Sequence, residues 1–517
     1  MDNGARMIWG REDRESASDK IILDYIKNRF GVSDVIEWDG IYRRKNLGEN
    51  SELLSLISQC LPPDRISFRS EDRILHSMGK SAMEYASIMD GVDVPIVDAV
   101  IYPEEDEIEC IMNKLRGKGI IISYGGGTSV TGGLRPNSQH GYAVSLDTRN
   151  LNVFNLDERS MVLEAGSGLL GPDIERRLNE RGLTLGNFPE SFQFSTLGGW
   201  IATNAAGQES NRYGKVRDMV LGIKMISPRG TFTDHVVPAE SAFFRVADIG
   251  IGSEGTFGII TRAWLKVRRV PDRYYYKAYM FRNFSEGLEV LRNEFTSGRS
   301  RMVARLSDDQ ETSLSLLAAG DSAAYRLFRS YLRYRGVHDS GSILVVMDDS
   351  KIDIKGGVGL GPAPAKMWSR TRFDRPYLYN ELIRHGIIAD TIETSVLWSK
   401  AQDLYSAVVS AFRNESDRLK IPSIIMCHAS HEYISGTALY FTFLFYSRKN
   451  KADVLRSLRG AILNAILASG GSISHHHGIG QYLSDLLPAY KGSAFELMSQ
   501  LKHFLDPDNM LNPQIIK

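Results

Sequence analysis

The chain has 517 residues, too many for one ordinary domain and enough to bury sizeable hydrophobic cores. Its 62 basic and 62 acidic residues balance, so no net charge favours nucleic acid or an anionic membrane. The three cysteines are widely spaced, which argues against a disulfide framework or a zinc site and fits a reducing compartment. The start shows no signal peptide, and no apolar run approaches the about 18 residues of a membrane span, so we expect a cytoplasmic protein.

The first half of the chain divides into two regions. Residues 1–92 are mixed and charged, and we interpret them as an N-terminal extension that packs on the rest, with helices at Lys20–Phe30 and Glu52–Cys60. In residues 93–271, strand-like runs alternate with helical stretches, which is an α/β pattern. The strand candidates are Val97–Tyr102, Gly119–Ile122, Gly141–Leu146 and Val162–Ala165, and the helix candidates are Asp106–Leu115 and Gly171–Arg181.

A glycine-rich loop follows the strand candidate at 119–122. Residues Ser123–Pro136 read S-Y-G-G-G-T-S-V-T-G-G-L-R-P. Because glycine lacks Cβ, consecutive N–H groups can converge on an anion, and Thr128 and Ser129 add hydroxyl donors. The pattern is neither G-x-G-x-x-G nor the Walker loop. Taken alone, it fits a simple glycine-rich turn as well as a phosphate or pyrophosphate cradle.

Two later loops rich in small residues narrow this choice. They read P-E-S-F-Q-F-S-T-L-G-G-W-I-A-T-N-A-A-G at 189–207 and G-S-E-G-T-F-G-I-I-T at 252–261. Together the three loops resemble the flavin-binding domain of the vanillyl-alcohol oxidase superfamily, the type-4 FAD-binding oxidases, over residues 90–270. The resemblance implies FAD, held noncovalently because Tyr124 and no histidine precedes the glycines. It assigns FAD binding to Gly125, Gly126, Gly127, Thr128, Ser129, Ser195, Thr196, Gly198, Thr203, Glu254, Gly255 and Gly258.

A second α/β region covers residues 272–460, and we interpret it as a substrate-binding cap. Its strand candidates are Tyr274–Phe281, Ser342–Met347 and Thr437–Tyr446, and its glycine- and proline-rich stretch Lys355–Trp368 is expected to be a mobile loop. Residues 461–517 carry a histidine motif, and their end resembles the superfamily's return to the FAD domain. The expected fold class is α/β (α+β), with a two-part FAD-binding domain of the vanillyl-alcohol oxidase type and an α/β cap.

The histidine motif is S-H-H-H-G-I-G at 474–480. Three adjacent histidines cannot share one helix face, and no Cys/His/Asp cluster nearby completes a metal site, so no metal is predicted. An exposed histidine-rich turn is one alternative. The triple histidine resembles that of alkyldihydroxyacetonephosphate synthases, where flavin-dependent 2-hydroxyacid dehydrogenases carry Glu-His-Gly. Other segments resemble the same family: V-A-R-L-S-D at 303–308, E-T-S-V-L-W at 393–398, D-M-V-L-G-I-K-M-I-S-P-R-G at 218–230, and the run 427–443 around Tyr440.

This resemblance implies an exchange without net redox change. A fatty alcohol would replace the acyl chain of acyl-dihydroxyacetone phosphate through a flavin N5 adduct and form an ether lipid precursor. It places His475, His476 and His477 at N5 and Tyr440 at the C1 proton, although a phenol of pKa ~10 acts as a base only if cations lower its pKa. Arg305 and Arg384 are candidates for the substrate phosphate.

Bland alternatives stay open for these residues. Instead of binding substrate, Arg305 could form a structural ion pair with Asp308 or Asp309. Instead of handling a proton, Tyr440 could be an ordinary core tyrosine. For the whole protein, the alternatives are an FAD-dependent 2-hydroxyacid dehydrogenase of the D-lactate or glycolate type and a non-catalytic flavin-binding protein. The substrate is expected to be a small lipid-like molecule that enters an apolar tunnel between cap and flavin domain. We further expect a homodimer, no nucleic-acid partner, and peripheral contact with a membrane surface.

Overall fold

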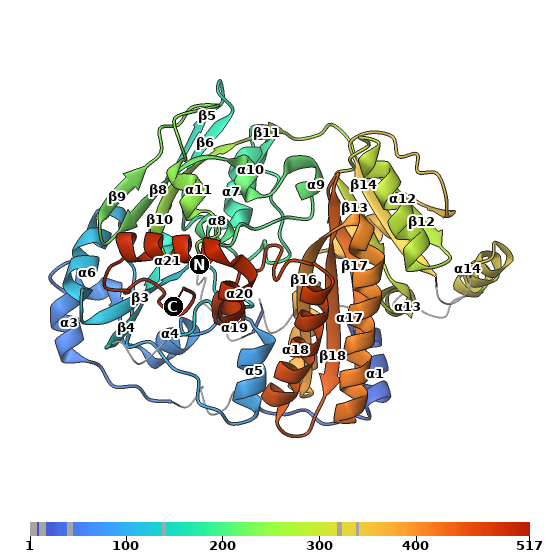
Figure 1. Ribbon diagram of the computed structural model, residues 1–517, viewed down its shortest axis with the longest axis horizontal. Coiled ribbons are helices and arrows are strands. Elements are labelled where there is room, and N and C mark those ends of the chain that lie inside the picture. Colours follow the sequence, from blue (N-terminus) through green and yellow to red (C-terminus); the bar gives the residue numbers. More distant parts are fainter. Residues whose placement is uncertain are drawn as a thin grey trace.

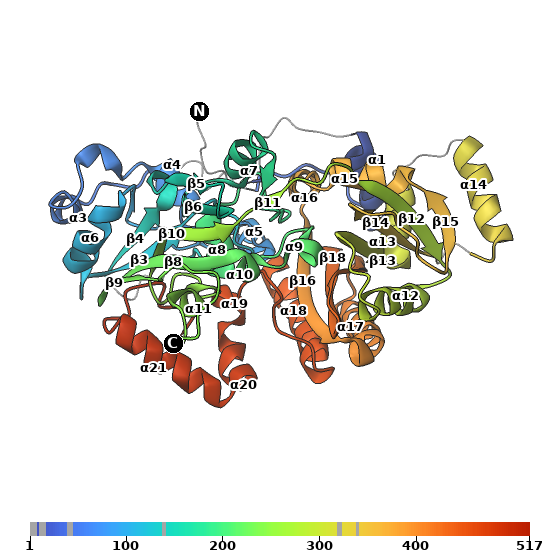
Figure 2. The same cartoon turned by 90° about the horizontal axis from the view of Figure 1, so that it is seen from above.

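Two lobes lie side by side in the computed structural model, which describes residues 8–9, 17–38, 45–136, 141–317, 323–337 and 341–516 (Figures 1 and 2). The first lobe contains the three glycine-containing loops, and the second contains the predicted cap. The helices on the first lobe's part of the chain are α3 (Ser51–Ile57), α4 (Ser70–Leu75), α5 (Ala82–Met89), α6 (Ile108–Leu115), α7 (Gly171–Asn179), α8 (Leu197–Thr203), α9 (Ser210–Tyr213), α10 (Val216–Met219) and α11 (Val246–Gly250).

The first lobe is built on a four-stranded and a five-stranded sheet. The four-stranded sheet has the order β1-β2-β4-β3, and its last three strands are parallel, with α6 as the crossover between β2 and β3. The other sheet is antiparallel, in the order β5-β6-β10-β8-β9. The strands are β1 (Ile66–Ser67), β2 (Ala99–Ile101), β3 (Gly119–Tyr124), β4 (Tyr142–Asp147), β5 (Phe154–Asp157), β6 (Val162–Gly166), β8 (Val220–Ser227), β9 (Gly230–Thr233) and β10 (Ile259–Lys266), with a small pair of β7 (Leu183–Thr184) and β11 (Arg268–Arg269).

Both ends of the chain contribute to this lobe. Strand β1, which lies in the predicted N-terminal extension, pairs with β2. At the other end, Leu511 forms a parallel bridge with Ile121 of β3. Helices α19 (Gly480–Leu483), α20 (Leu487–Lys491) and α21 (Ser493–Leu505) bring the chain back to the first lobe, where they appear in red in Figure 1.

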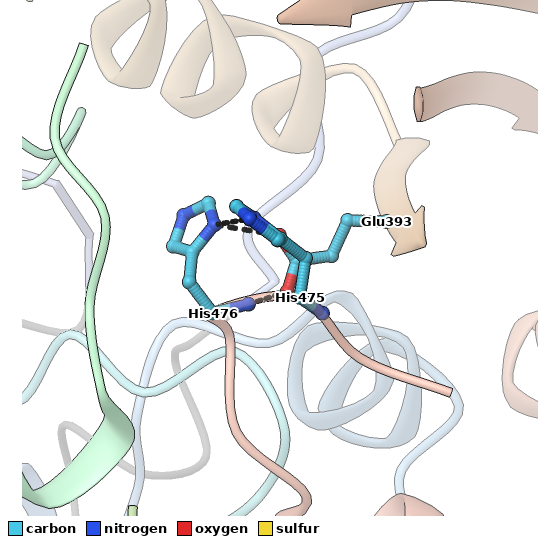
Figure 3. A group of neighbouring side chains, drawn as sticks. All are labelled: Glu393, His475 and His476. Carbon is cyan, nitrogen blue, oxygen red and sulfur yellow. Dashed lines mark hydrogen bonds and ion pairs between the residues drawn. The ribbon is translucent and has the colours of Figure 1, made fainter. Parts of the chain in front are cut away.

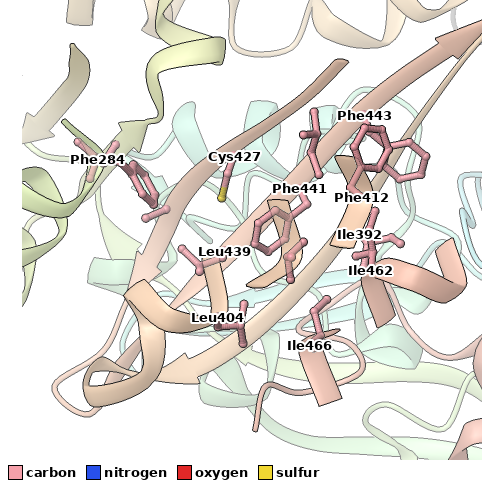
Figure 4. Close-up of a cluster of buried hydrophobic side chains, with 14 of the residues drawn as sticks. Phe284, Ile392, Leu404, Phe412, Cys427, Leu439, Phe441, Phe443, Ile462 and Ile466 are labelled. Carbon is pink, nitrogen blue, oxygen red and sulfur yellow. The ribbon is translucent and has the colours of Figure 1, made fainter. Parts of the chain in front are cut away.

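The cap is a seven-stranded antiparallel sheet in the order β15-β12-β14-β13-β17-β18-β16. Buried phenylalanines, among them Phe412, Phe441 and Phe443, pack one face of this sheet against its helices (Figure 4). The strands are β12 (Tyr275–Phe281), β13 (Val303–Ser307), β14 (Ser342–Asp348), β15 (Val358–Gly361), β16 (Ile387–Leu397), β17 (Ser423–Glu432) and β18 (Gly436–Tyr446). The helices are α12 (Phe284–Thr296), α13 (Asp309–Leu317), α14 (Ala323–Tyr334), α15 (Ala363–Thr371), α16 (Arg375–Arg384), α17 (Trp398–Leu419) and α18 (Lys451–Ala468).

The N-terminal helix α1 (Ala17–Phe30) packs on the cap rather than on the first lobe. Its side chains Leu23, Ile26 and Phe30 join a buried cluster with Leu382 and Leu444 of the cap. Among the residues that the structure describes, no helix combines the length and apolar character needed to cross a membrane.

Most predicted elements are confirmed within a few residues at their ends, but the expected mobile loop at 355–368 is wrong. Strand β15 lies inside this stretch, and α15 begins within it at Ala363. The error has a physical reason: Pro364 lies in the first turn of α15, where proline needs no hydrogen bond from its nitrogen. The proline that suggested a loop therefore marks the start of a helix.

The expectation of no disulfide is also wrong, because Cys60 and Cys110 are bonded to each other. Cys60 follows α3 and Cys110 lies in α6, and these helices pack together although the cysteines are 50 residues apart. The spacing of the cysteines in the sequence does not predict that contact. The remaining cysteine, Cys427, is free and buried.

We predict that alkylation of the unfolded protein without reductant labels one cysteine, and that reduction raises the number to three. Replacing both Cys60 and Cys110 by serine should lower the free energy of unfolding by about 2–4 kcal/mol, because the crosslink restricts the unfolded chain. Mass spectrometry and denaturant titration measure the two effects. Three labels on the unreduced protein would contradict the disulfide.

Candidate active site

A cavity of about 450 Å³ lies between the first lobe and the cap sheet. Its walls combine all three glycine-containing loops with side chains from β16, β17 and β18. Every residue that the sequence assigned to FAD lines it: Gly125, Gly126, Gly127, Thr128, Ser129, Ser195, Thr196, Gly198, Thr203, Glu254, Gly255 and Gly258. The cavity thus brings together loops that are far apart in the sequence.

The glycine-rich loop after β3 fits a phosphate-bearing cofactor. Its backbone is free of side chains at Gly125–Gly127, and Thr128 and Ser129 line the same wall. The buried Lys80 also lines the cavity, and its backbone N–H donates to the Ser129 carbonyl at 2.7 Å. Burial lowers the pKa of Lys80 to about 8. Amides, hydroxyls and one ammonium group on a single wall form a suitable site for a pyrophosphate.

Gly126 is required for a different reason from the one that the sequence suggested. A Cβ at this position would lie 1.8 Å from the carbonyl oxygen of Phe194, which belongs to the second loop. The glycine therefore lets the first two loops pack directly on each other, in addition to any approach of the backbone to a ligand.

Glu254 connects the third loop to the histidine motif. Its carboxylate accepts hydrogen bonds from the backbone N–H groups of Ile479 and Gly480, at 2.6 and 3.0 Å. Burial raises the pKa of Glu254 to about 7, against the opposing effect of these two amides. A Cβ on Gly478 would lie 2.8 Å from the Glu254 carboxyl group, so the turn needs glycine for this close contact.

Glu393 on β16 holds the histidine turn from the cap side (Figure 3). Its Oε1 atom accepts the backbone N–H groups of His475, His476 and His477, at 2.9, 2.5 and 2.5 Å. Its Oε2 atom lies 2.7 Å from Nδ1 of His476. Burial alone would raise the pKa of Glu393, but the three histidines together, His476 most strongly, outweigh burial and keep that pKa well below its usual range. The carboxylate thus fixes all three histidines through their backbone.

The same residues form a group that could hold a metal ion, which the sequence did not anticipate. Candidate ligand atoms of Glu393, His475 and His476 lie within 4.8 Å of one another. Glu393 comes from β16, about 80 residues before the histidines, so their spacing in the sequence hides the cluster. These atoms already contact one another and Tyr440, through hydrogen bonds of the two histidines and the ion pair between Glu393 and His476.

Tyr440 on β18 lies at the centre of the polar end of the cavity. Its hydroxyl is 3.1 Å from Nδ1 of both His475 and His476, and its ring stacks on His428 with the centroids 4.8 Å apart. Burial, with Glu393 and Tyr433, raises the pKa of Tyr440 well above its usual value. The condition that the sequence set for a tyrosine base, a pKa lowered by cations, is therefore not met. Tyr440 is a protonated hydrogen-bonding group.

The imidazoles around Tyr440 are mostly neutral. Burial lowers the pKa of His475 well below its usual value, and burial lowers the pKa of His477 to about 4 against the opposing effect of Glu393. Burial and Arg305 lower the pKa of His428 to about 4. These side chains can donate or accept hydrogen bonds near neutral pH without carrying charge.

The two arginine candidates lie in different places. Arg305 lines the cavity and pairs with Glu311, not with Asp308 or Asp309 as the alternative interpretation expected. Arg384, at the end of α16, pairs with Glu381 at 3.2 Å and does not line the cavity. Instead Arg375, at the start of α16, lines it and shares the Glu311 carboxylate at 3.1 Å. Two guanidinium groups facing one carboxylate leave positive charge for an anionic substrate.

The cavity changes from polar to apolar along the cap sheet. The strand register aligns Tyr440 with Glu393 and His428, then Thr442 with Thr391 and Met426, then Leu444 with Ala389 and Ile424. Beyond the last row, the wall is completed by apolar residues of α1, α13 and α16: Ile26, Leu314, Leu378 and Leu382. The apolar end of the cavity therefore lies within the cap and under α1, whereas the sequence analysis expected an apolar tunnel between cap and flavin lobe.

Comparisons with known proteins agree with this arrangement. The family model for the FAD binding domain matches residues 97–235, and that for the C-terminal domain of FAD linked oxidases matches residues 362–516. An alkyldihydroxyacetonephosphate synthase of Dictyostelium discoideum is 32% identical over 87% of this chain and 78% of its own length. The chain belongs to the alkyldihydroxyacetonephosphate synthase family.

Other members of the family support this family assignment. The alkyldihydroxyacetonephosphate synthase of Trypanosoma brucei brucei is 29% identical over 88% of this chain and 79% of its own length. A solved alkyldihydroxyacetonephosphate synthase structure superposes with a TM-score of 0.80 and 26% identity, covering 96% of this chain and 92% of that chain. FAD is the cofactor of this protein. The residues that line the cavity fit it.

Several residues of this family member escaped the sequence analysis. Arg375 and His431 both line the cavity, and Glu393 holds the histidine turn. Glu393 stood in a quoted motif and His431 lay in the segment around Tyr440, so a signal existed for both, although neither received a role. Arg375 had no motif around it, and only the packing of α16 against the sheet identifies it.

We predict that Gly126→Ala abolishes FAD binding, because the added Cβ would collide with the Phe194 carbonyl and separate two loops that line the cofactor site. The matched control is Gly460→Ala in α18, where a Cβ meets nothing within 4 Å. The ratio of flavin to protein absorbance after purification is the measurement. Wild-type flavin content in Gly126→Ala would contradict the prediction.

Proposed function

We propose that this protein is an FAD-dependent alkyldihydroxyacetonephosphate synthase. It exchanges the acyl chain of acyl-dihydroxyacetone phosphate for a fatty alcohol and releases a fatty acid. The chemistry that FAD supplies when bound is nucleophilic displacement at C1 of the substrate without net oxidation. The observation that carries the proposal is the gradient along β16, β18 and β17, from histidines and tyrosine to an apolar end.

The cavity face of the cap sheet, with the apolar residues that continue it beyond Leu444, has a length comparable to that of a lipid tail. From Tyr440 to Leu444 the strand advances four residues, which is about 13 Å at ~3.3 Å per residue. One tail occupies half of a bilayer's hydrocarbon core of ~30 Å, or about 15 Å. A 2-hydroxy acid has no group of that size, so the alternative of a 2-hydroxyacid dehydrogenase leaves this end of the cavity without a use.

The polar end offers a place for the phosphate. Arg305 and Arg375 line it together, and both contact the buried Glu311. Arginine binds phosphate through parallel N–H groups in a planar fork. We assign the substrate phosphate to this pair, in place of the pair of Arg305 and Arg384 that the sequence suggested.

Tyr440 and the histidine turn surround the position next to these arginines. The Tyr440 hydroxyl contacts His475 and His476, and the ring of Tyr440 stacks on His428, which contacts Arg305 at 3.1 Å. In this role Tyr440 donates a hydrogen bond to the reacting end of the substrate, and His476 and His477 orient and exchange protons there.

A membrane is the natural source of a fatty alcohol, and we infer that α14 provides the contact. This helix lies at the outer edge of the cap in Figures 1 and 2, away from the flavin lobe. It exposes Leu327, Tyr331 and Tyr334 beside exposed Arg333. Apolar and aromatic groups flanked by arginine are typical of helices that lie on anionic lipid surfaces. The preceding helix α13 supplies Leu314 to the apolar end of the cavity.

We predict that the purified holoenzyme, given acyl-dihydroxyacetone phosphate and a fatty alcohol, forms an ether product and one fatty acid per turnover without any electron acceptor. Mass spectrometry of both products, together with an oxygen electrode, measures this. Flavin bleaching by a 2-hydroxy acid, with no ether product, would instead identify a dehydrogenase.

The arginine assignment is part of the same experiment. Arg375→Gln should raise KM for the phosphate-bearing substrate by roughly 10- to 100-fold, the effect of losing a charge-assisted hydrogen bond of about 1.5–3 kcal/mol. Arg384→Gln, whose guanidinium pairs with Glu381 outside the cavity, is the comparison. A larger effect from Arg384→Gln would restore the assignment made from the sequence.

We predict that the protein sediments with vesicles containing phosphatidylserine and that the double variant Leu327→Glu/Tyr334→Glu loses this binding, because the change places carboxylates on the exposed face of α14. The matched control is Phe243→Glu, which alters a residue 97% exposed on the other lobe. Vesicle co-sedimentation with full flavin content is the measurement. Equal binding by the double variant and the wild type would exclude α14 as the contact.

A further inference from the structure

The N-terminal segment reaches the cavity, although the sequence analysis gave it no role there. Trp9 is 9% exposed and lines the same cavity as the residues assigned to FAD. The preceding residue, Ile8, is also buried and belongs to a hydrophobic cluster with Tyr85 and Ile383. The indole of Trp9 is therefore part of the wall of the cofactor cavity.

Asn380 of α16 fixes Trp9 through its backbone. The side-chain oxygen of Asn380 accepts the Trp9 N–H at 2.9 Å, and its side-chain nitrogen donates to the Trp9 carbonyl at 2.7 Å. Asn380 is only 4% exposed. A primary amide carries a donor and an acceptor on one planar group, so it can satisfy both backbone groups of a single residue, whereas a carboxylate or an aliphatic side chain cannot. Buried backbone groups outside helices and sheets need partners of this kind.

The end of α16 holds the N-terminal segment a second time. The N–H of Ile36 donates to the Arg384 carbonyl at 2.8 Å, and Nδ1 of His385 lies 2.9 Å from the Asp34 carbonyl oxygen. Trp9 precedes α1 in the chain, and Asp34 and Ile36 follow it, so the segment is attached to α16 on both sides of α1. The position of Trp9 is thus set by a helix of the cap.

The ring of Trp9 extends from α16 toward the cofactor loops. Its centroid is 6.1 Å from that of Phe194, which belongs to the second loop. The carbonyl of Phe194 is the group that excludes a Cβ at Gly126 of the first loop, and the next residue, Ser195, lines the cavity. The cap therefore holds the backbone of Trp9, while its indole packs beside two loops of the flavin lobe.

This placement favours the cofactor over the substrate as the partner of the indole. The ring contact of Trp9 is with a cofactor loop, whereas Tyr440 and Arg305, which form the polar end proposed for the substrate, come from the cap sheet. FAD contains two flat aromatic ring systems. An indole packs well on such a surface, because aromatic rings gain from stacking in addition to the apolar area that they bury.

We propose that Trp9 is a cofactor-binding residue, supplied by the N-terminal segment and positioned by Asn380. The indole packs on bound FAD and slows its release. Asn380 acts through Trp9 and is a positioning residue. The inference goes beyond the proposed function, because a synthase and a dehydrogenase would retain FAD in the same way.

The first test titrates the apoprotein with FAD and follows the flavin fluorescence. Trp9→Leu should raise the Kd of FAD by roughly 10-fold, whereas Trp9→Phe, which keeps an aromatic ring, should stay within about threefold of wild type. The matched control is Trp38→Leu. Trp38 is 8% exposed and packs on Tyr85, but it does not line the cavity. This control should lower the thermal midpoint and leave the Kd of FAD unchanged.

The role of Asn380 is tested with a double variant. Asn380→Ala should also raise the Kd of FAD. Trp9→Leu/Asn380→Ala should bind FAD as weakly as Trp9→Leu alone, because the effects of residues that act through one contact do not add. Effects that multiply in the double variant would overturn the positioning role of Asn380.

A measurement on the wild-type protein decides the question if Trp9→Leu does not fold. Hydroxyl radicals oxidise accessible tryptophan side chains, and trypsin places Trp9 and Trp38 in different peptides for mass spectrometry. Bound FAD should lower the oxidation of Trp9 several-fold and leave that of Trp38 unchanged.

Three outcomes would overturn the proposal. The first is equal oxidation of Trp9 in the apoprotein and the holoprotein. The second is a wild-type Kd of FAD in Trp9→Leu. The third is a raised KM for the substrate in Trp9→Leu with wild-type FAD binding, which would assign the indole to the substrate.

Discussion

The candidate active site depends on two buried carboxylates that hold one turn of the chain. Glu393 from the cap accepts three consecutive N–H groups at His475–His477, and Glu254 from the flavin lobe accepts those of Ile479 and Gly480. A buried carboxylate needs such donors, and an irregular turn needs acceptors for its amides. Each therefore satisfies the other. Because one carboxylate comes from each lobe, the histidines are fixed relative to both the cofactor loops and the cap sheet.

The cap sheet extends this local arrangement into a cavity that is polar at one end and apolar at the other. Since side chains alternate along a strand, residues two apart share the cavity face, and the antiparallel register aligns three such rows across β16, β18 and β17. The first row is polar and ionisable, the second mixed, and the third apolar. One sheet face thereby combines a polar, ionisable surface with an apolar one, without a separate domain for each.

The sequence was informative where local pattern determines structure. Periodicity located most of the strands and helices, and the ordered glycine loops indicated a flavin site whose residues all line one cavity. Sequence analysis failed where contacts between residues far apart in the chain determine the structure. The bond between Cys60 and Cys110 depends on the contact of α3 with α6, and Arg375 enters the cavity only through the placement of α16.

For some residues the sequence predicted the position correctly but not the chemical role. Tyr440 lies beside the histidines as the resemblance implied, but burial raises the pKa of its hydroxyl instead of preparing a phenolate. Gly126 lies in the cofactor loop, yet it is the neighbouring loop at Phe194 that excludes a side chain there. Residue type and motif identify a position, whereas solvation and contact distance decide its role, and these appear only in three dimensions.

The return of the chain to the first lobe has a consequence for synthesis. Ile121 of β3 donates its N–H to the Met510 carbonyl and accepts from the Asn512 N–H, and the Asn512 side chain donates to the carbonyls of Gly133 and Glu254. Gly133 and Asn512 are 379 residues apart. At ~5–20 residues per second, the ribosome reaches Asn512 about 20–75 s after Gly133. The cradle for FAD is thus translated before the cap and closed only after it, so the edge of β3 in the nascent flavin lobe stays unpaired while the cap is synthesised.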